Sequence, residues 1–191
     1  MPCIDKQGEK RDSDKMLWNI FLSGDDNAFG LLYNEYASRL YTYGLHFTSN
    51  HELVKDCVQD LFVKLYTNRK RLQPVENVKV YFYHSMKNTL FNVFKKEASC
   101  YQIDTIEPVF CIESSAETQL IETEQLYEQK KLLTRMIEYL TPRQREVLYY
   151  RFVEELSHEE ICKLMQMNYQ SVRNLLHRTI LKMRSITTGE P

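Results

Sequence analysis

A basic segment near the C-terminus, running from Tyr169 to Arg184, has the side chains that recognise DNA. No acidic residue occurs between Gln170 and Ser185. Arginine and asparagine near the start of a helix can reach base edges in a major groove, whereas cations further along suit phosphates. The polar residues of this segment are Gln170, Arg173, Asn174, His177, Arg178 and Lys182.

The segment is preceded by two predicted helices with strong start signals. Thr141 and Gln144 have capping-box spacing, and so do Ser157 and Glu160. Asn168 is the predicted cap of the basic helix. The apolar residues at helical spacing are Val147, Leu148 and Phe152, then Ile161, Leu164 and Met165, then Val172, Leu176, Ile180 and Met183. The pattern predicts a helix-turn-helix whose second helix enters a major groove; the alternative is a helical hairpin with a solvated charged face.

A second candidate surface lies on the helix predicted from Asn77 to Lys96. Phe82, Met86, Leu90 and Val93 share one face of this helix. Another face carries Tyr81, His84, Ser85, Asn88, Asn92 and Lys95. Unpaired bases stack on aromatic rings, amides bond to bases and lysines follow phosphates, so this face is typical of single-strand binding. The alternative is a core aromatic cluster beside an ordinary polar face.

A third candidate surface, a polar strip, lies on the helix predicted from His51 to Tyr66. Its residues are Asp56, Gln59, Asp60 and Lys64, opposite a broad apolar face. Such a strip is usually solvated surface. A basic loop, Asn68 to Pro74, follows it.

The remaining elements give an all-α fold with two helical domains. We predict a disordered leader at residues 1–16, a first domain at 17–97 with helices from Leu17 and from Ala28 to Phe47, a linker at 98–116 and a second domain at 117–187. The linker is acidic, because Glu97 to Gln129 holds eight acids and no lysine or arginine.

Composition excludes several classes of function. The 191 residues carry a net charge of −1, so a nucleic-acid site requires local segregation of charge. Five scattered cysteines without a CxxC pair, no apolar run long enough to span a membrane and no signal-peptide core favour a reduced, cytoplasmic protein. There is no metal-ligand spacing, Gly-rich phosphate loop or catalytic triad pattern, so we expect no metal, no cofactor and no enzymatic activity.

Two blocks of the chain resemble one family. The segment TPRQREVLYYRFVEELSHEEICKLMQMNYQSVRNLLHRTILKMR resembles region four of bacterial sigma factors of the sigma-70 family, extracytoplasmic-function group. The segments AFGLLYNEYASRLYTYG, VKDCVQDLFVKLY and NVKVYFYHSMKNTLFNVFKK resemble regions 2.1, 2.2 and 2.3–2.4 of that group. The resemblance implies a transcription initiation factor that binds core RNA polymerase and promoter DNA, with a region-2-like bundle and a region-4-like helix-turn-helix domain.

The resemblance also implies roles for individual residues. Polymerase binding, to the clamp helices of the largest subunit, falls to Asp56, Gln59, Asp60, Phe62 and Lys64. The melted minus-ten element would be held by Lys70, Arg71, Asn77, Lys79, Tyr81, Asn88, Asn92 and Lys96. The minus-thirty-five element would be read by Gln170, Ser171, Arg173 and Asn174, with His177, Arg178 and Lys182 on phosphates. Further implied partners are the flap of the second polymerase subunit and an anti-sigma factor, and the acidic linker would lie in the RNA-exit path.

The chain departs from the family pattern at three positions. Gln166 stands where a turn glycine is usual, Leu175 stands where a basic residue is common, and Tyr66 stands where tryptophan is common. A competing hypothesis is a helix-turn-helix repressor or activator whose N-terminal helices dimerise or sense a ligand. That hypothesis explains the basic helix but neither the strip around Asp60 nor the Asn77–Lys96 helix.

Overall fold

The computed structural model describes the backbone of residues 6–101, 109–111 and 124–188, and these residues contain helices and no strand. The chain divides into two compact units, Met1–Pro108 and Val109–Pro191. The predicted all-α class with two helical domains is confirmed. No helix in the described ranges combines the length and the apolar character needed to cross a membrane.

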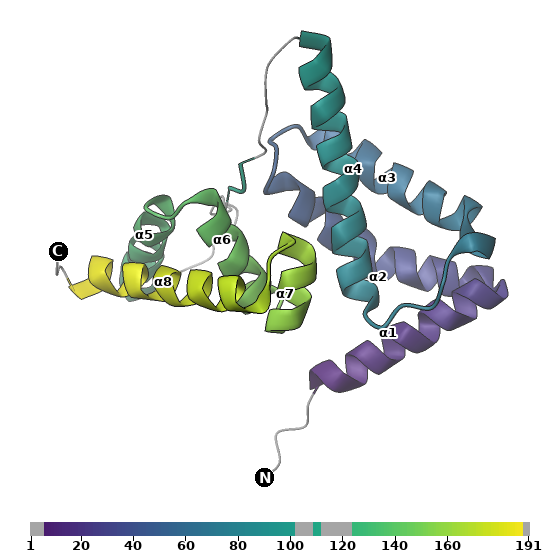
Figure 1. Cartoon of the computed structure of the whole chain (residues 1–191), viewed down its shortest axis with the longest axis horizontal. Helices are drawn as coiled ribbons and strands as arrows, with labels where there is room; N and C mark the ends of the chain where they lie inside the picture. Colours follow the sequence, from purple (N-terminus) through teal and green to yellow (C-terminus); the bar gives the residue numbers. More distant parts are fainter. Residues whose placement is uncertain (1–5, 102–108, 112–123, 189–191) are drawn as a thin grey trace. The chain divides into compact units, whose positions relative to one another are not determined.

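Unit 1 packs α1, α2 and α3 around a long fourth helix, α4 (Figure 1). The elements are α1 (Lys6–Ser23), α2 (Asp26–Leu45), α3 (His51–Thr67), the 3-10 turn η1 (Arg69–Arg71) and α4 (Val78–Tyr101). The predicted breaks supply the caps: the Asp25 carboxylate accepts from the backbone N–H of Asn27 at 2.7 Å, and Asn50 Oδ1 accepts from that of Leu53 at 3.1 Å. Capping satisfies N–H groups that a helix leaves without partners.

The core of unit 1 is aromatic and closely packed. Trp18, Tyr36 and Phe82 are fully or almost fully buried, and the rings of Tyr36 and Phe82 stack at a centroid distance of 4.6 Å. At Gly44 a Cβ would lie 2.6 Å from a methyl group of Val54 and 2.9 Å from the Met86 methyl. Only glycine allows α3 and α4 this close to α2.

The predicted disordered leader is wrong for residues 6–16, because α1 begins at Lys6 rather than near Leu17. Lys10 forms an ion pair with Glu35 on α2 at 2.5 Å, and the Tyr36 hydroxyl donates to the Asp14 carboxylate. The segment has little apolar periodicity of its own. Its order comes from these contacts to α2, which local sequence patterns do not report.

Unit 2 contains the predicted helix-turn-helix. Its elements are α5 (Glu124–Glu138), α6 (Pro142–Leu148), the π-helical segment η2 (Tyr149–Val153), α7 (His158–Met165) and α8 (Tyr169–Thr188). Both predicted capping boxes are confirmed, since the backbone N–H groups of Gln144 and Glu160 donate to the hydroxyls of Thr141 and Ser157, and each N3 side chain accepts from the N-cap N–H in return. The predicted helix over residues 117–123 lies outside the described residues.

The π-helical segment changes the orientation of the residues that follow α6. Val147 and Leu148 are buried, as their spacing predicts, but Phe152 is 61% exposed. A wider turn shifts side chains away from the 3.6-residue register. The Tyr150 hydroxyl donates to the buried Glu146 carboxylate at 2.9 Å, which gives that acid a partner inside unit 2.

Part of the predicted linker, residues 98–116, belongs to the two units. Residues 98–101 form the last turn of α4. Phe110 is 1% exposed and packs on Tyr149 with ring centroids 5.4 Å apart, so this side chain belongs to the core of unit 2. Residues 102–108 and 112–116 lie outside the described residues.

The turn between α7 and α8 contains a left-handed residue. Gln166 has φ 53° and ψ 45°, and its side chain is exposed. The backbone N–H of Ser171 donates to the Asn168 side chain at 2.8 Å, which confirms the predicted cap of α8. The left-handed conformation explains why glycine is favourable at position 166.

Phe110→Ala should destabilise unit 2 by about 3–5 kcal/mol, because it removes a buried ring from a packed core. Hydrogen exchange of α6 and α8 amides measures the loss, and fluorescence of Trp18, the one tryptophan of the chain, reports unit 1 separately. Val109→Ala is the control, since Val109 is 49% exposed. Equal protection in the two variants would contradict the anchoring of Phe110.

Gln166→Gly should stabilise unit 2 by about 0.5–1 kcal/mol, because glycine adopts the left-handed conformation without steric cost. Hydrogen exchange of α7 and α8 amides provides the measurement. Gln166→Ala shortens the same exposed side chain but keeps the Cβ, so it should give no gain. A gain in the alanine variant as large as in the glycine variant would disprove the backbone explanation.

Candidate nucleic-acid interfaces

The exposed face of α8 brings together most of the residues predicted to contact the minus-thirty-five element. Val172 and Leu176 are buried against the rest of unit 2, as is Thr179. On the other side, the residues with exposed side chains are Gln170, Arg173, Asn174, His177 and Arg178. Gln170 Nε2 donates to Asn174 Oδ1 at 2.9 Å, so two amides one turn apart are oriented together. Ser171 is half-buried beside them.

Lys182 is not part of this group. Its Nζ donates to the backbone carbonyl of Tyr139, at the end of α5, at 2.6 Å. Nine residues separate it from Arg173, about two and a half helical turns, so the two side chains leave α8 on opposite sides. The structure therefore gives Lys182 a contact that joins α8 to α5.

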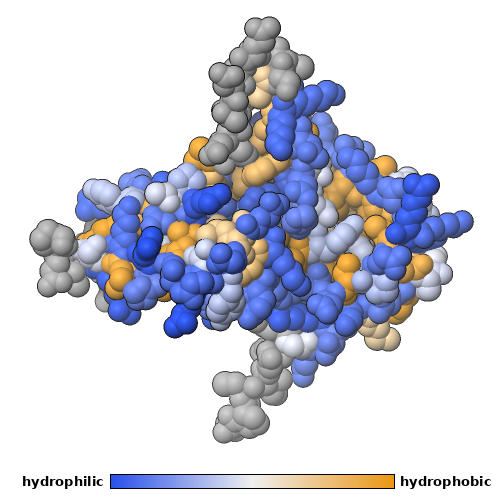
Figure 2. Space-filling view, viewed as in Figure 1, coloured by the Kyte–Doolittle hydropathy of each residue, from blue (hydrophilic) through white to orange (hydrophobic). Residues whose placement is uncertain are grey.

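Unit 1 presents a polar stripe along α4. Tyr81 is half-buried, and Asn88, Asn92 and Lys96 are exposed. Asn88 Nδ2 lies 3.1 Å from His84 Nδ1. Burial raises the pKa of the Tyr81 phenol, so this side chain stays neutral and able to stack or donate a hydrogen bond. A hydrophilic band follows α4 on the face seen in Figure 2.

Two residues predicted for the same surface have other contacts. Asn77 Oδ1 accepts from the backbone N–H of Val80 at 3.0 Å, so this amide caps α4. Lys79 Nζ lies 5.9 Å from the centroid of the Tyr83 ring, and its charge lowers the pKa of Glu35 on α2, although less than the hydrogen bond from Lys10 does. Lys79 therefore lies beside Tyr83, one turn further along α4 and not among the residues of the stripe.

The basic loop after α3 separates its three cations into two kinds. Lys70 and Arg71 are exposed. Arg69 is only 22% exposed and donates to Asp26 Oδ1 at 2.9 Å. Its guanidinium also lies over the rings of Tyr66 and Phe21, at 5.4 and 5.9 Å from their centroids. Three adjacent cations look alike in sequence, so only the tertiary structure distinguishes the internal one.

The predicted strip on α3 is exposed as expected, with Asp56, Gln59, Asp60 and Lys64 on the surface. Lys64 Nζ lies 3.7 Å from Asp60 Oδ2, and both side chains are about two-thirds exposed (64% and 66%), so this pair adds little stability. Phe62 does not share this surface: it is 3% exposed and packs behind it.

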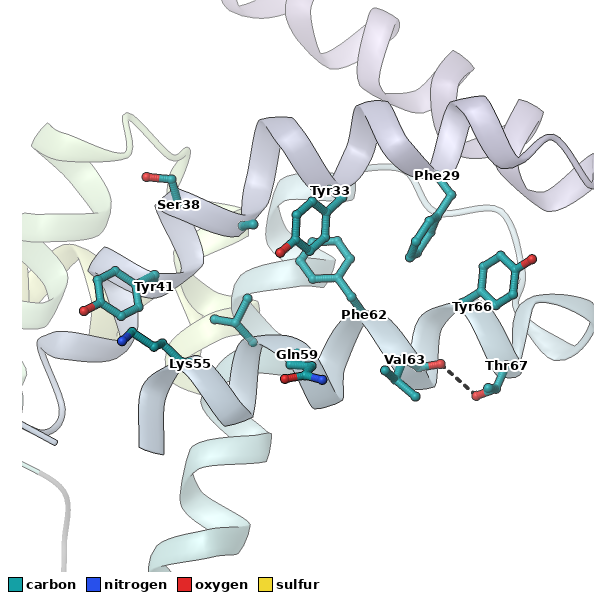
Figure 3. Close-up of a pocket in the computed structure, with 12 residues that line it drawn as sticks. Phe29, Tyr33, Ser38, Tyr41, Lys55, Gln59, Phe62, Val63, Tyr66 and Thr67 are labelled. Carbon is teal, nitrogen blue, oxygen red and sulfur yellow. Dashed lines mark hydrogen bonds between the residues drawn. The ribbon is translucent and has the colours of Figure 1, made fainter. Parts of the chain in front are cut away.

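An apolar groove lies beside this strip, between α2 and α3, and sequence reasoning missed it. The groove has a volume of about 690 Å³. Phe29 and Tyr33 enter it from α2, and Phe62 and Tyr66 from α3 (Figure 3). Tyr33 and Tyr66 are 46% and 43% exposed, and Val63 on the rim is 53% exposed. The sequence does contain one indication of this surface: Val63 lies between Asp60 and Lys64, where an apolar residue interrupts a polar face.

In the described ranges, no three histidine, cysteine or acidic side chains are grouped closely enough to bind a metal ion. The features described above are exposed helical faces and an apolar groove.

Comparisons with known proteins identify both units. The family model of Sigma-70 region 2 matches residues 32–100, and that of Sigma-70 region 4 matches residues 130–183. RNA polymerase sigma factor YlaC of Bacillus subtilis (strain 168) is 25% identical over 160 residues, covering 82% of this chain and 90% of that protein.

Two solved structures share the fold. The structure of CnrH in complex with the cytosolic domain of CnrY has a TM-score of 0.59 and 16% identity, covering 93% of this chain and 99% of that one. The co-crystal structure of the sigma factor RpoE in complex with the anti-sigma factor NepR from Bartonella quintana has a TM-score of 0.57 and 16% identity. The match covers 85% of this chain and 98% of that one. Matches to both regions, in the family order, show that the chain belongs to the sigma-70 family of RNA polymerase sigma factors, which are transcription initiation factors; within that family it resembles the extracytoplasmic-function group.

Proposed function

We propose that unit 1 binds core RNA polymerase and the melted minus-ten strand, while unit 2 reads the minus-thirty-five duplex through α8. The observation that carries this proposal is the acid-free polar face of α8, opposite a buried apolar face in a helix-turn-helix. The protein acts by binding alone, without catalysis. It works where the polymerase is, in the cytoplasm.

On α8, Gln170, Arg173 and Asn174 lie in the first two turns, the part of a recognition helix that reaches base edges. Arginine pairs with guanine, and the amides pair with adenine. His177 and Arg178 lie one turn further along and contact phosphates. We assign Lys182 no direct contact with DNA, because its ammonium group is bonded to the end of α5.

On unit 1, the exposed amides Asn88 and Asn92 and the ring of Tyr81 contact unpaired bases, while Lys70, Arg71 and Lys96 follow the phosphates. A half-buried tyrosine suits stacking, since its ring is already held in place and ordering it on binding costs little entropy. Asn77 and Lys79 support this surface indirectly: Asn77 caps α4, and the Lys79 ammonium group lies near the ring of Tyr83.

The polymerase contacts the exposed strip on α3, with Asp56, Gln59 and Asp60 forming its polar part. Val63 and the adjoining apolar groove supply the desolvated centre that a stable interface needs, and the polar strip forms its rim. Phe62 shapes the floor of the groove. The RpoE structure contains an anti-sigma factor, and we propose that a protein of that type holds this chain when it is not bound to polymerase.

Run-off transcription with core polymerase on a promoter library tests the proposal. Addition of the protein should confer selectivity on a defined set of promoters. The competing repressor or activator hypothesis predicts instead a dimer that binds duplex operator DNA without polymerase. The match to Sigma-70 region 2 favours the initiation factor.

Arg173→Ala should reduce promoter binding by about 1–3 kcal/mol on the preferred minus-thirty-five sequence and by much less on a scrambled one. Competition binding of the polymerase complex to the two duplexes measures the difference. Lys182→Ala is the control: it removes a cation from the same helix but should leave the discrimination between the two sequences unchanged. Equal losses on both sequences in Arg173→Ala would assign this arginine to phosphates.

Asp60→Arg should weaken the association with core polymerase about tenfold or more, because it reverses a charge at the rim of the proposed interface. Fluorescence-detected titration of core polymerase gives the affinity. Asp12→Arg makes the same change in charge at an exposed position of α1 and should bind normally. Unchanged affinity in Asp60→Arg, with Trp18 emission showing an intact unit 1, would remove the α3 strip from the interface.

A further inference from the structure

The loop between α3 and α4, residues 68–77, presents Lys70 and Arg71 and is held at two points by side chains that face inward. At its start, Arg69 contacts three elements at once: Phe21 of α1, Asp26 of α2 and Tyr66 of α3. An arginine held by a carboxylate and two rings has lost most of its freedom, because a planar guanidinium stacks and hydrogen-bonds simultaneously.

Further along the loop, the indole N–H of Trp18 donates to the backbone carbonyl of Gln73 at 3.2 Å. Trp18 is 0% exposed, so the donor of this part-buried bond is shielded from water, whereas Gln73 itself is exposed. The same indole packs edge-on against Tyr81 of α4, with ring centroids 4.8 Å apart. One buried side chain of α1 thus touches both the loop and the aromatic residue of the polar stripe.

Between these two points the loop is closed by its own backbone. Arg71 N–H donates to the carbonyl of Asn68 at 2.8 Å, and Leu72 N–H donates to that of Arg69 at 3.2 Å. Lys70 and Arg71 therefore project from a short fixed turn. Fixing a loop before it binds removes an entropic cost that a mobile loop would meet on binding.

We propose that Arg69 and Trp18 are positioning residues that hold the loop ready for the single strand, so that Lys70, Arg71 and Tyr81 meet it in one arrangement. This inference rests on the proposed minus-ten function of unit 1. It assigns to α1 a task in strand binding without any contact between α1 and DNA. It also means that Asp26, although negatively charged, favours DNA binding, because it holds Arg69 in place.

Because Asp26 is an acid, the two explanations predict opposite changes in DNA affinity when it is removed. Asp26→Ala releases Arg69 while leaving every cation in place and raising the net charge by one. Simple electrostatics predicts tighter DNA binding, whereas loss of positioning predicts weaker binding. The Asp26 side chain is 68% exposed, so its truncation leaves no cavity. Trp18→Phe is the second variant, which removes the N–H donor and keeps a buried ring.

The assay uses the full chain bound to core polymerase. Its DNA probe is a fork junction with a single-stranded minus-ten segment, and its sequence is that of the promoter most strongly selected in the run-off experiment. Asp26→Ala and Trp18→Phe should each bind this probe about three- to tenfold more weakly. Asp12→Ala removes the same charge from an exposed position on α1 and should bind at least as well as the wild type. Circular dichroism and hydrogen exchange of α4 show that each variant is folded.

The slope of log affinity against log salt separates the explanations. With positioning lost, the slope should be unchanged or shallower. Tighter binding and a steeper slope in Asp26→Ala would show that the released Arg69 reaches phosphates itself, which overturns the proposal. Wild-type binding by both variants would also overturn it.

A paired substitution, Lys70→Ala with Arg71→Ala, keeps this inference distinct from the function on which it rests. If this double variant binds the probe normally, the loop does not hold the strand and the proposed function of the loop fails. If it binds weakly while Asp26→Ala and Trp18→Phe bind normally, only the positioning inference fails.

Discussion

The close approach of three helices at Gly44 fixes the orientation of the surfaces of unit 1. Val54 of α3 and Met86 of α4 both pack where this glycine leaves room on α2. Because each helix has one buried face, seating Val54 inward turns Asp56, Gln59 and Asp60 outward, and seating Met86 inward turns Asn88 and Asn92 outward. Two surfaces with different proposed partners are therefore set by one close approach of helices.

Faces of single helices could be predicted from the sequence because they follow from local periodicity. The α3 strip, the α8 face and both capping boxes depend on residues three or four positions apart, and all of them have the expected exposure or hydrogen bonds. The contacts of α1 could not be predicted in this way. Asp14 meets Tyr36 and Lys10 meets Glu35 only after α1 and α2 pack together. The local sequence of either helix does not indicate which residue of the other it will contact.

The same limit explains which intramolecular contacts of the candidate site residues could not be predicted. Periodicity places a residue on a face but does not say whether its polar group is already bonded inside the protein. Asn77 and Lys182 illustrate this, because each has a side chain bonded to backbone: Asn77 to the first turn of α4, and Lys182 to the end of α5. Arg69, which is not among the predicted contacts, shows the same limit, since its neighbours Lys70 and Arg71 have the same chemistry and only Arg69 meets an acid and two rings.

The number of exposed cations limits what α8 can do on its own. The exposed cations of α8 are Arg173, Arg178 and Arg184, together with Lys182, whose ammonium group is bonded to the carbonyl of Tyr139; the helix has no acid, and the net charge of the chain is −1. A few phosphate contacts give modest affinity that falls quickly with salt, so unit 2 alone would not retain a promoter against competing DNA. Joining α8 to a second DNA-binding surface on the same polypeptide raises the effective concentration of each for its own element. Weak contacts at the two proposed DNA elements thus become selective together.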